Sequence, residues 1–543
     1  MDVFTIGSDN METTNLSKIK RDKMLHTINE IKKNITDEET LNNLSLIENE
    51  LTKKKYGLIW EEHEERVDKE LETQIPTFEE VKDKEIVSNY DDKFNFLLEG
   101  DNLHSLYLLE KTHKNKIDVI YIDPPYNTGN NDFIYNDNFV VSDDGYKHSK
   151  WLSFMQRRLE ISKKLLSDKG VIFISIDDNE FAQLKLLCDD IFGENNFVTT
   201  IHWKRSESQN NSAKQIAVVG EYILCYAINK YNRIFNKVDL KDTAIKEYRY
   251  IDEKTGKNFR RGTIVDNTRG KNLLEVTSPN GITKTIKSIR NKNFFEEKNK
   301  NGEIYWTETG TPYLKIFLEN SEGQVSNNWF DSFGVNEDAA DDLREMNINF
   351  SFSKPSKLIK QLIKLVSEKN SIVLDFFAGS GTTAQSVLEL NKEDQGSRKF
   401  ILCTNNENNI CEEATYKRLL KLKEGTTKFE KTDFNLKYYK TSYILRMNND
   451  ESNLHDNLLI NIKNLIQLEN GIEIDNKKIR IYLNESELDE FSINKKELSI
   501  CEKIYISSDI LLTLEQEKTF EENNIEVYVI PEYYFEDEIM EVA

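Results

Sequence analysis

The sequence has few cysteines, and their spacing is not that of a metal site. Five occur in 543 residues, and none forms the Pro-Cys pair of enzymes whose thiolate attacks carbon 5 of cytosine. All of them lie in or near apolar segments, where thiols are usually buried and inert. The five positions are Cys188, Cys225, Cys403, Cys411 and Cys501. We therefore expect buried free thiols and no metal site.

Long apolar runs are also missing. No stretch of 18 apolar residues occurs, and the first ten residues, MDVFTIGSDN, lack the apolar centre of a signal peptide. These absences predict a soluble, cytoplasmic protein without a membrane segment. A length of 543 residues predicts two to four domains.

Positive charge is scarce overall but concentrated in one window. The chain has 73 Lys and Arg against 95 Asp and Glu, a net charge of −22. Residues 451–543 hold 8 basic and 22 acidic side chains, whereas residues 231–300 hold 17 basic and 9 acidic ones. A basic window inside an acidic chain indicates a polyanionic partner such as DNA. The alternative is a solvated, lysine-rich insertion without a partner.

The stretch IDVIYIDPPYNTG at 117–129 carries the clearest chemistry. Its apolar half predicts a buried parallel strand, which Asp123-Pro124-Pro125-Tyr126 ends because two prolines remove backbone donors and leave their carbonyls free. Acceptors from Asp123 and the Pro124 carbonyl suit a planar amino group, on whose ring Tyr126 would stack. Open α/β sheets bind ligands at such strand ends. The alternative is a proline-rich turn with an incidental Asp and Tyr.

A second strand, turn and helix follow at 371–390, with the glycine turn Phe377-Ala378-Gly379-Ser380-Gly381-Thr382. The glycines allow close approach of a ligand, and the helix N-terminus offers free N–H groups to a carboxylate. The turn is neither G-x-G-x-x-G nor a P-loop, because it lacks the third glycine and the lysine. A carboxylate-bearing nucleoside therefore fits better than a pyrophosphate.

Residue patterns predict five regions of an α/β protein. Amphipathic stripes indicate an N-terminal helical region at 1–90, and strand–helix alternation indicates a core in two halves, 91–230 and 346–430. Short β-rich runs with aromatic residues among the cations form an insertion at 231–345, whose part from 301 onward reads as a connector. Residues 431–543 form a small acidic α/β region with strands near 479–483, 504–507 and 527–530. The polar stretch 130–149 is a candidate lid.

The order of the two motifs, D-P-P-Y before F-x-G-S-G-T with a basic insertion between them, resembles the DNA amino-methyltransferases that use S-adenosylmethionine. The D-P-P form resembles adenine-N6 enzymes more than cytosine-N4 enzymes. Residues 56–63 (YGLIWEEH) and 98–103 (LEGDNL) further resemble modification (Mod) subunits of type III restriction–modification systems. The resemblance implies a Rossmann-like core with an inserted target-recognition domain. It also implies double-stranded DNA as substrate, a homodimer, and an ATP-dependent restriction (Res) subunit as partner.

Position by position, the resemblance assigns Asp123, Pro124, Pro125 and Tyr126 to a flipped-out adenine. The residues that it assigns to the cofactor are Asp101, Asp123, Ser353, Lys354, Pro355, Asp375, Phe376, Phe377, Gly379, Ser380, Gly381, Thr382 and Glu407. Two departures stand out. Asn405-Asn406 occupies the place of the ribose-holding acid, which leaves Glu407 as the candidate. Gly220-Glu221 replaces a His that often precedes the Tyr-Ile-Leu strand, and no catalytic role is assigned to Glu221.

Four alternatives remain at the level of sequence. A solitary methyltransferase would lack a restriction partner, and a cytosine-N4 enzyme would differ in its product. A protein glutamine methyltransferase also uses paired prolines, but typically with Asn before them and without a large basic insertion. The fourth alternative is a catalytically inactive DNA-binding subunit, although both motifs are intact.

Overall fold

The computed structural model describes residues 16–33, 35–52, 60, 63, 65–88, 93–129, 133–135, 138–139, 144–209, 213–240, 242–445 and 451–530. The chain divides into two compact units, Met1–Glu61 and Glu62–Ala543. Most of the resembling stretch 56–63 lies outside the described residues, as do residues 130–132, 136–137 and 140–143 of the candidate lid at 130–149.

The first unit is a pair of helices, α1 (Leu16–Lys33) and α2 (Glu38–Thr52). Ile28 is buried between polar neighbours, and Lys32 joins the helices by bonding to Ser45 at 2.9 Å and Glu48 at 2.6 Å. The prediction of helices for the N-terminal region holds here. It is wrong for residues 74–80, which form a strand of the second unit.

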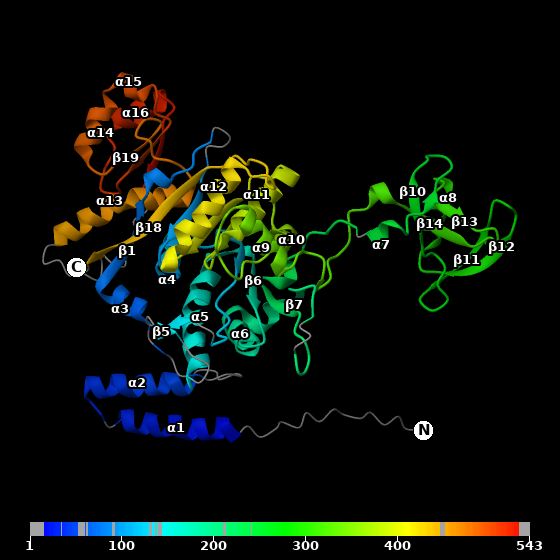
Figure 1. Cartoon of the computed structure of the whole chain (residues 1–543), viewed down its shortest axis with the longest axis horizontal. Coiled ribbons are helices and arrows are strands. Elements are labelled where there is room, and N and C mark those ends of the chain that lie inside the picture. The colour runs from blue at the N-terminus through cyan, green and yellow to red at the C-terminus, as the bar shows by residue number, and fades with distance from the viewer. Residues whose placement is uncertain are drawn as a thin grey trace. The chain divides into compact units, whose positions relative to one another are not determined.

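A ten-stranded sheet forms the centre of the second unit (Figure 1). Six neighbouring strands, from β18 to β6, run parallel, and helices connect most of them. Strands β1 and β8 run in the opposite direction, whereas β7 and β15 run in the same direction as the six. In spatial order the strands are β1 (Gln74–Glu80), β18 (Leu436–Leu445), β2 (Asn95–Glu99), β17 (Lys399–Thr404), β16 (Ile372–Asp375), β3 (Ile117–Ile122), β6 (Leu166–Ile176), β8 (Gly220–Ala227), β7 (Phe197–Lys204) and β15 (Trp329–Phe330). The predicted α/β core is confirmed.

Two predicted boundaries of this core are wrong. The C-terminal region was expected to begin at 431, but β18 lies inside the central sheet between β1 and β2. The insertion was expected to continue to 345, but β15 pairs with β7, and helix α9 (Asn336–Glu345) buries Ala339 and Leu343. In both places the partner strand is distant in sequence, so local composition did not reveal the pairing.

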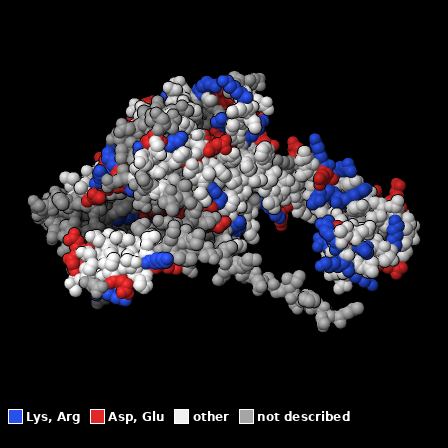
Figure 2. All heavy atoms as spheres, turned by 90° about the horizontal axis from the view of Figure 1, so that it is seen from below, with Lys and Arg blue, Asp and Glu red and all other residues white. Residues whose placement is uncertain are grey.

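The insertion itself is a small β-rich unit closed by a bridge between Val238 and Gln324. It contains a four-stranded sheet, a two-stranded ribbon and two helices, on which Lys and Arg side chains gather (Figure 2). Residues 304–317 are strands of this sheet, so the predicted connector is wrong. The elements are α7 (Asp242–Ile245), β9 (Tyr250–Ile251), β10 (Asn258–Gly262), β11 (Asn272–Thr277), β12 (Thr283–Ser288), α8 (Lys292–Lys300), β13 (Ile304–Trp306) and β14 (Pro312–Phe317).

The C-terminal region has its own small core. After α13 (Glu451–Asn470), three parallel strands, β19 (Ile479–Tyr482), β20 (Lys503–Ile506) and β21 (Glu526–Val529), lie where strands were predicted. Helices α14 (Glu485–Ser492), α15 (Lys495–Leu498) and α16 (Leu514–Glu522) complete this part. Leu488 and Ile504 are fully buried in it.

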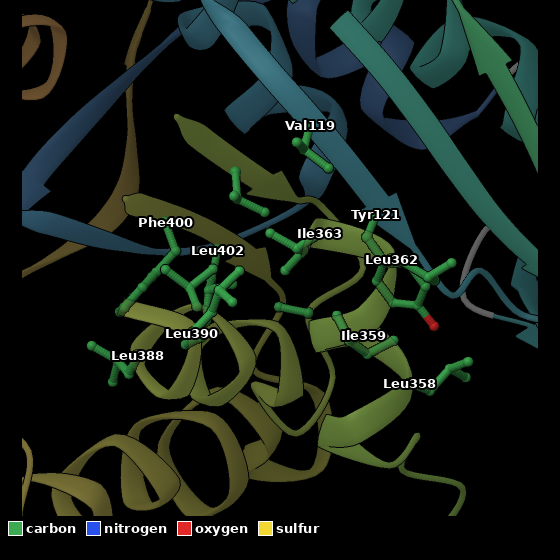
Figure 3. Close-up of a cluster of buried hydrophobic side chains, with 14 of the residues drawn as sticks. Val119, Tyr121, Leu358, Ile359, Leu362, Ile363, Leu388, Leu390, Phe400 and Leu402 are labelled. Carbon is green, nitrogen blue, oxygen red and sulfur yellow. The ribbon is translucent and has the colours of Figure 1, made fainter. Parts of the chain in front are cut away.

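Helices cover the central sheet. On one face α10 (Ser356–Val366) and α11 (Thr382–Asp394) pack against β3 and β17 through a cluster that includes Ile359, Leu362, Val119 and Leu402 (Figure 3). The other principal helices are α3 (Arg66–Thr73), α4 (Asn102–His113), α5 (Lys147–Leu165), α6 (Phe181–Cys188) and α12 (Lys417–Glu424). All five cysteines are buried and free, as predicted. This rigid core fixes the strand ends that carry both motifs.

Candidate functional site

The two sequence motifs meet because their strands are neighbours. β3 and β16 run parallel, with Val119 opposite Val373 and Ile120 opposite Leu374. Parallel strands end at the same edge of a sheet, so the D-P-P-Y turn after β3 and the glycine turn after β16 lie side by side. The fold thus joins two motifs that the sequence separates by the whole insertion.

Lys354 lies between the two motifs and binds the first of them. Its ammonium is 2.8 Å from both carboxylate oxygens of Asp123 and 2.9 Å from the hydroxyl of Tyr126. The side chain is only 8% exposed. The family resemblance assigned Lys354 to the cofactor pocket. In this structure its ammonium instead donates to both carboxylate oxygens of Asp123.

Glu221 is a second carboxylate at this ammonium. Its Oε2 lies 3.5 Å from Lys354 and 3.1 Å from the Tyr126 hydroxyl, and its Oε1 lies 3.2 Å from Arg205. Because β8 runs antiparallel to β6, a residue near the start of β8 reaches the edge at which the parallel strands end. Sequence reasoning noticed Glu221 only as a departure from a family pattern. The structure makes it part of the site.

These charges set the protonation states of the site. Burial raises the pKa of Asp123 above its ordinary value, and the adjacent Lys354 ammonium opposes that shift. Burial by itself would lower the pKa of Lys354, but Asp123 and Glu221 raise it, so the amine stays charged. Burial and the same two carboxylates raise the pKa of Tyr126, so its hydroxyl stays protonated.

Buried polar contacts hold the D-P-P-Y turn from behind. Trp151 donates to the Pro125 carbonyl at 2.7 Å. Both proline carbonyls were expected to be free, so this contact leaves the Pro124 carbonyl as the acceptor for a ligand. Asn127 takes a left-handed φ of 57° and donates to Glu180 at 2.5 Å. His148 lies 2.7 Å from the same Glu180 oxygen, and burial raises the pKa of Glu180 to about 8. Sequence reasoning missed Glu180, which has no motif of its own.

The glycine turn is held by the carboxylate of Asp375. Its two oxygens accept hydrogen bonds from the Phe377 amide at 3.0 Å and the Thr383 hydroxyl at 2.5 Å. Burial raises the pKa of Asp375 to about 7. Gly379 and Gly381 have φ values of 50° and 78°, a conformation that other residues adopt only with strain. Asp375 therefore shapes the turn from inside.

Three hydroxyls gather beside the glycine turn. The Oγ atom of Ser353 lies 2.8 Å from that of Ser380 and 3.0 Å from the Thr382 hydroxyl, while Ser380 and Thr382 are 3.3 Å apart. Arg418 donates to Thr382 at 2.6 Å and to Ser353 at 3.4 Å. These hydroxyls form a polar cluster with a cation behind it.

Arg418 is buried, and the carboxylates of Asp342 and Glu389 act on its charge only from beyond ion-pair distance. Its guanidinium is 1% exposed, its Nε has no hydrogen-bond partner, and within the described parts of the chain no carboxylate lies within ion-pair distance of it. Burial lowers its pKa to about 10. Buried charges are normally paired, so this cluster has the character of an anion site. Arg418 belongs to no sequence motif, so sequence reasoning assigned it no role.

The remaining predicted residues lie around this centre in different ways. Asp101 caps α4 by accepting from Leu103 and pairs with Arg158 at 3.3 Å. Phe376 is fully buried, so it supports the turn from the core and its ring does not face a ligand. Pro355 precedes α10 directly, and Phe377 is partly exposed. Glu407 is exposed on a short turn after β17, and its role stays a prediction.

The described residues contain neither a candidate metal site nor a helix suited to span a membrane. No group of three or more His, Cys, Asp and Glu side chains there could hold a metal ion. Within the same part of the chain, no helix combines the length and the apolar character needed to cross a membrane.

Curated proteins similar to this chain include subunits of restriction–modification enzymes. The type III StyLTI Mod subunit of Salmonella typhimurium is 36% identical over 356 residues, covering 59% of this chain and 54% of that protein. The EcoPI Mod subunit of Escherichia phage P1 is 31% identical over 376 residues, covering 58% of each. The type II methyltransferase M.KpnI of Klebsiella pneumoniae is 34% identical over 339 residues, covering 56% of this chain and 79% of that protein. The chain thus spans somewhat more than half the length of the two Mod subunits.

A family profile covers the site. The profile described as DNA methylase matches residues 117–416, more than half of the chain, from the strand before D-P-P-Y to the segment after the glycine turn. The match agrees with the Rossmann-like α/β core and with the position of both motifs at one sheet edge. The chain belongs to the DNA methylase family.

Proposed function

We propose that this chain transfers a methyl group from S-adenosylmethionine to N6 of an adenine in double-stranded DNA, as the modification and recognition subunit of a type III restriction–modification system. The single observation that carries the proposal is the position of the D-P-P-Y turn beside the glycine turn. An acceptor set for an amino group and a cradle for a carboxylate-bearing nucleoside share one sheet edge. Membership of the DNA methylase family and the similarity to Mod subunits support the assignment.

The residues present fit this cofactor. Gly379 and Gly381 add no side chain to the turn, and Arg418, whose Nε has no hydrogen-bond partner, donates to the hydroxyls of Ser353 and Thr382 beside it. The turn and this cluster would hold the methionine end. When bound, the cofactor supplies a methyl group already activated on a sulfonium.

The chain's own residues act on the target amino group. Base flipping would bring the adenine to Tyr126, where Asp123 and the Pro124 carbonyl accept its two N–H bonds and hold the nitrogen in the direction of attack. In this structure Lys354 holds both oxygens of Asp123. Tyr126 also donates to Oδ1, so Oδ2 keeps an acceptor site for the base. Glu221, 3.5 Å from the same ammonium, is a second carboxylate that holds Lys354 beside the base.

The assignment predicts a defined product. The purified chain is incubated with S-adenosylmethionine and unmethylated plasmid DNA, which is then digested to nucleosides for mass spectrometry. N6-methyladenine supports the proposal, N4-methylcytosine supports the cytosine alternative, and no product with either base contradicts a DNA methyltransferase. The Asp123→Ala variant should give no product while keeping the native circular dichroism spectrum, and full turnover by it would contradict the assigned role.

The type III assignment needs a second experiment. Co-expression with a candidate restriction subunit, followed by affinity purification, should give a stable complex that cleaves unmethylated DNA in the presence of ATP. A chain that methylates DNA but forms no such complex would be a solitary methyltransferase. The same purification reports whether two copies of this chain are present, as a homodimer requires.

A further inference from the structure

The ribbon of β11 and β12 is a separate structural element of the insertion. The two strands pair over six residues, from Asn272 opposite Ser288 to Thr277 opposite Thr283, and form a two-stranded sheet of their own. Leu274, Val276 and Ile286 face inward, where they join a small core. The ribbon is thus anchored on one face and leaves the other face uncovered.

The uncovered face presents pairs of side chains directly opposite each other. Leu273 lies opposite Lys287 and Glu275 opposite Thr285, and all four residues are exposed. Leu273 alone is 71% exposed, which is high for a leucine in an ordered strand. The face therefore offers an apolar group, a carboxylate acceptor, a hydroxyl and a cation within one short ribbon.

Unneutralised cations surround this face. Lys287 lies on this face, Lys271 and Arg290 flank the ribbon, and Lys284, opposite Val276, lies on its other face. All four are exposed, and within the described part of the insertion no carboxylate lies within ion-pair distance of any of them. Arg269, by contrast, pairs with Asp266 at 2.7 Å. Elsewhere this acidic chain pairs many of its lysines, so the unpaired cations on the insertion mark a surface for a polyanion (Figure 2).

A neighbouring face of the insertion is less suited to a partner. Arg261 stacks on Tyr250 at 4.2 Å and on Tyr305 at 4.5 Å, and it donates to the Tyr305 hydroxyl at 2.8 Å. Its guanidinium and the aromatic faces already bind one another, so this cluster stabilises the four-stranded sheet.

We propose that the β11–β12 ribbon enters the major groove of double-stranded DNA and reads base edges there, with the flanking cations on the phosphates. The proposal rests on the proposed function and names the element that would select the target sequence. The major groove is wide enough for a two-stranded ribbon, and its floor presents amino groups, acceptors and the thymine methyl. Glu275 suits a cytosine amino group, Thr285 suits either donor or acceptor, and Leu273 suits a thymine methyl.

The cation part predicts a change in salt dependence. The variant K271Q/K284Q/K287Q should bind a duplex containing the methylated site more weakly, with the slope of log K against log salt shallower by about 2–3, because each phosphate contact contributes about 0.9. The control K477Q/K495Q/K496Q removes three exposed lysines from the C-terminal region. It should leave the slope unchanged. A slope equal to wild type in the ribbon variant would overturn the proposal.

The base-reading part predicts a change in selectivity. The variant E275Q/T285V should keep the salt slope but lose discrimination against duplexes with single substitutions in the site by about 10-fold or more at one or two positions. Unchanged discrimination at every position would overturn base reading by this face. Both variants should bind S-adenosylmethionine like wild type in calorimetry, which separates local effects from misfolding. If wild type neither binds nor methylates duplex DNA, the proposed function itself fails, an outcome distinct from failure of the ribbon.

Discussion

Two carboxylates hold the ammonium of Lys354. A double-mutant cycle can therefore measure what each of them contributes to the stability of the folded protein. The perturbations are Asp123→Asn, Glu221→Gln and both together. Asp123 provides two contacts at 2.8 Å and Glu221 one at 3.5 Å, and the Lys354 side chain is 8% exposed. Each single variant leaves the buried ammonium with one carboxylate, whereas the double variant leaves it with none.

The magnitudes follow from that difference. Loss of charge-assisted hydrogen bonds with one counter-ion retained should cost about 1–2 kcal/mol. A buried charge without a partner costs about 3–5 kcal/mol. The loss in the double variant should therefore exceed the sum of the two single losses by about 1 kcal/mol. For a unit of this length the unfolding entropy makes 1 kcal/mol correspond to about 1 °C in the thermal midpoint.

The pH dependence provides an internal check. Without carboxylates, burial lowers the pKa of Lys354 in the folded state below its unfolded value. The unfolded state then binds more protons, so the stability of the double variant rises with pH. Differential scanning calorimetry should show that the double variant loses less stability, relative to wild type, at pH 9 than at pH 7. The single variants should not show this change. Additive single effects, or an excess that is equal at both pH values, would refute a shared buried ammonium.

The same variants separate chemistry from stability. Asp123→Asn should lower kcat by roughly 10²–10⁴-fold, the range for a group that acts on the reacting proton. Glu221→Gln leaves Asp123, Pro124 and Tyr126 in place but removes one counter-ion of Lys354, so it should lower kcat much less than Asp123→Asn does. Equal loss of kcat in both variants would contradict the separate roles.

Three further predictions concern the supporting residues. Glu180→Gln should match wild type in stability near pH 5 and exceed it at pH 8. The pKa of Glu180 is raised from 4.5 to about 8 in the folded state, so wild-type stability falls as the pH rises between these two values. A difference in thermal midpoint that does not depend on pH would contradict this. Arg418→Met should weaken binding of S-adenosylmethionine about 10-fold or more in calorimetry, the order expected from losing a charged hydrogen bond. Binding of an analogue without the carboxylate should not change. Equal losses for both ligands would indicate a merely structural role. Gly381→Ala should cost about 1–3 kcal/mol and weaken cofactor binding, because its φ is 78° and the new Cβ meets Thr415 at 3.2 Å, whereas the control Gly145→Ala, with open space, should change neither.

Local sequence was sufficient for the motifs and for most strands. The apolar run 117–122 followed by two prolines can only be a strand that stops, and the glycines at 379 and 381 supply the two left-handed positions of the turn. Such features depend on neighbouring residues alone. They predicted the strand and the glycine turn that carry the two motifs, whereas the roles of the individual residues stay a prediction.

Pairings over long sequence distances were not predictable in this way. Lys354 and Asp123 are 231 positions apart, and Tyr126 and Glu221 are 95 apart. Strand β1 was assigned to the helical region. Its partner β18 lies more than 350 positions later in the chain, so no neighbouring residue indicated that it pairs in a sheet. Arg418 and Glu180 carry no motif. Their roles come from burial without a full set of partners, a property that only the fold creates.

Ser353 and Lys354 are consecutive residues that contact different halves of the site. Ser353 belongs to the hydroxyl cluster in front of Arg418, whereas Lys354 holds Asp123. A ligand carboxylate at the hydroxyl cluster would contact the same short segment whose next side chain holds Asp123. If a bound cofactor raises DNA affinity through this segment, linkage requires that bound DNA raise cofactor affinity by the same factor. The order of the two motifs in the chain does not affect this link, because Ser353 contacts the glycine turn and Lys354 contacts the D-P-P-Y turn.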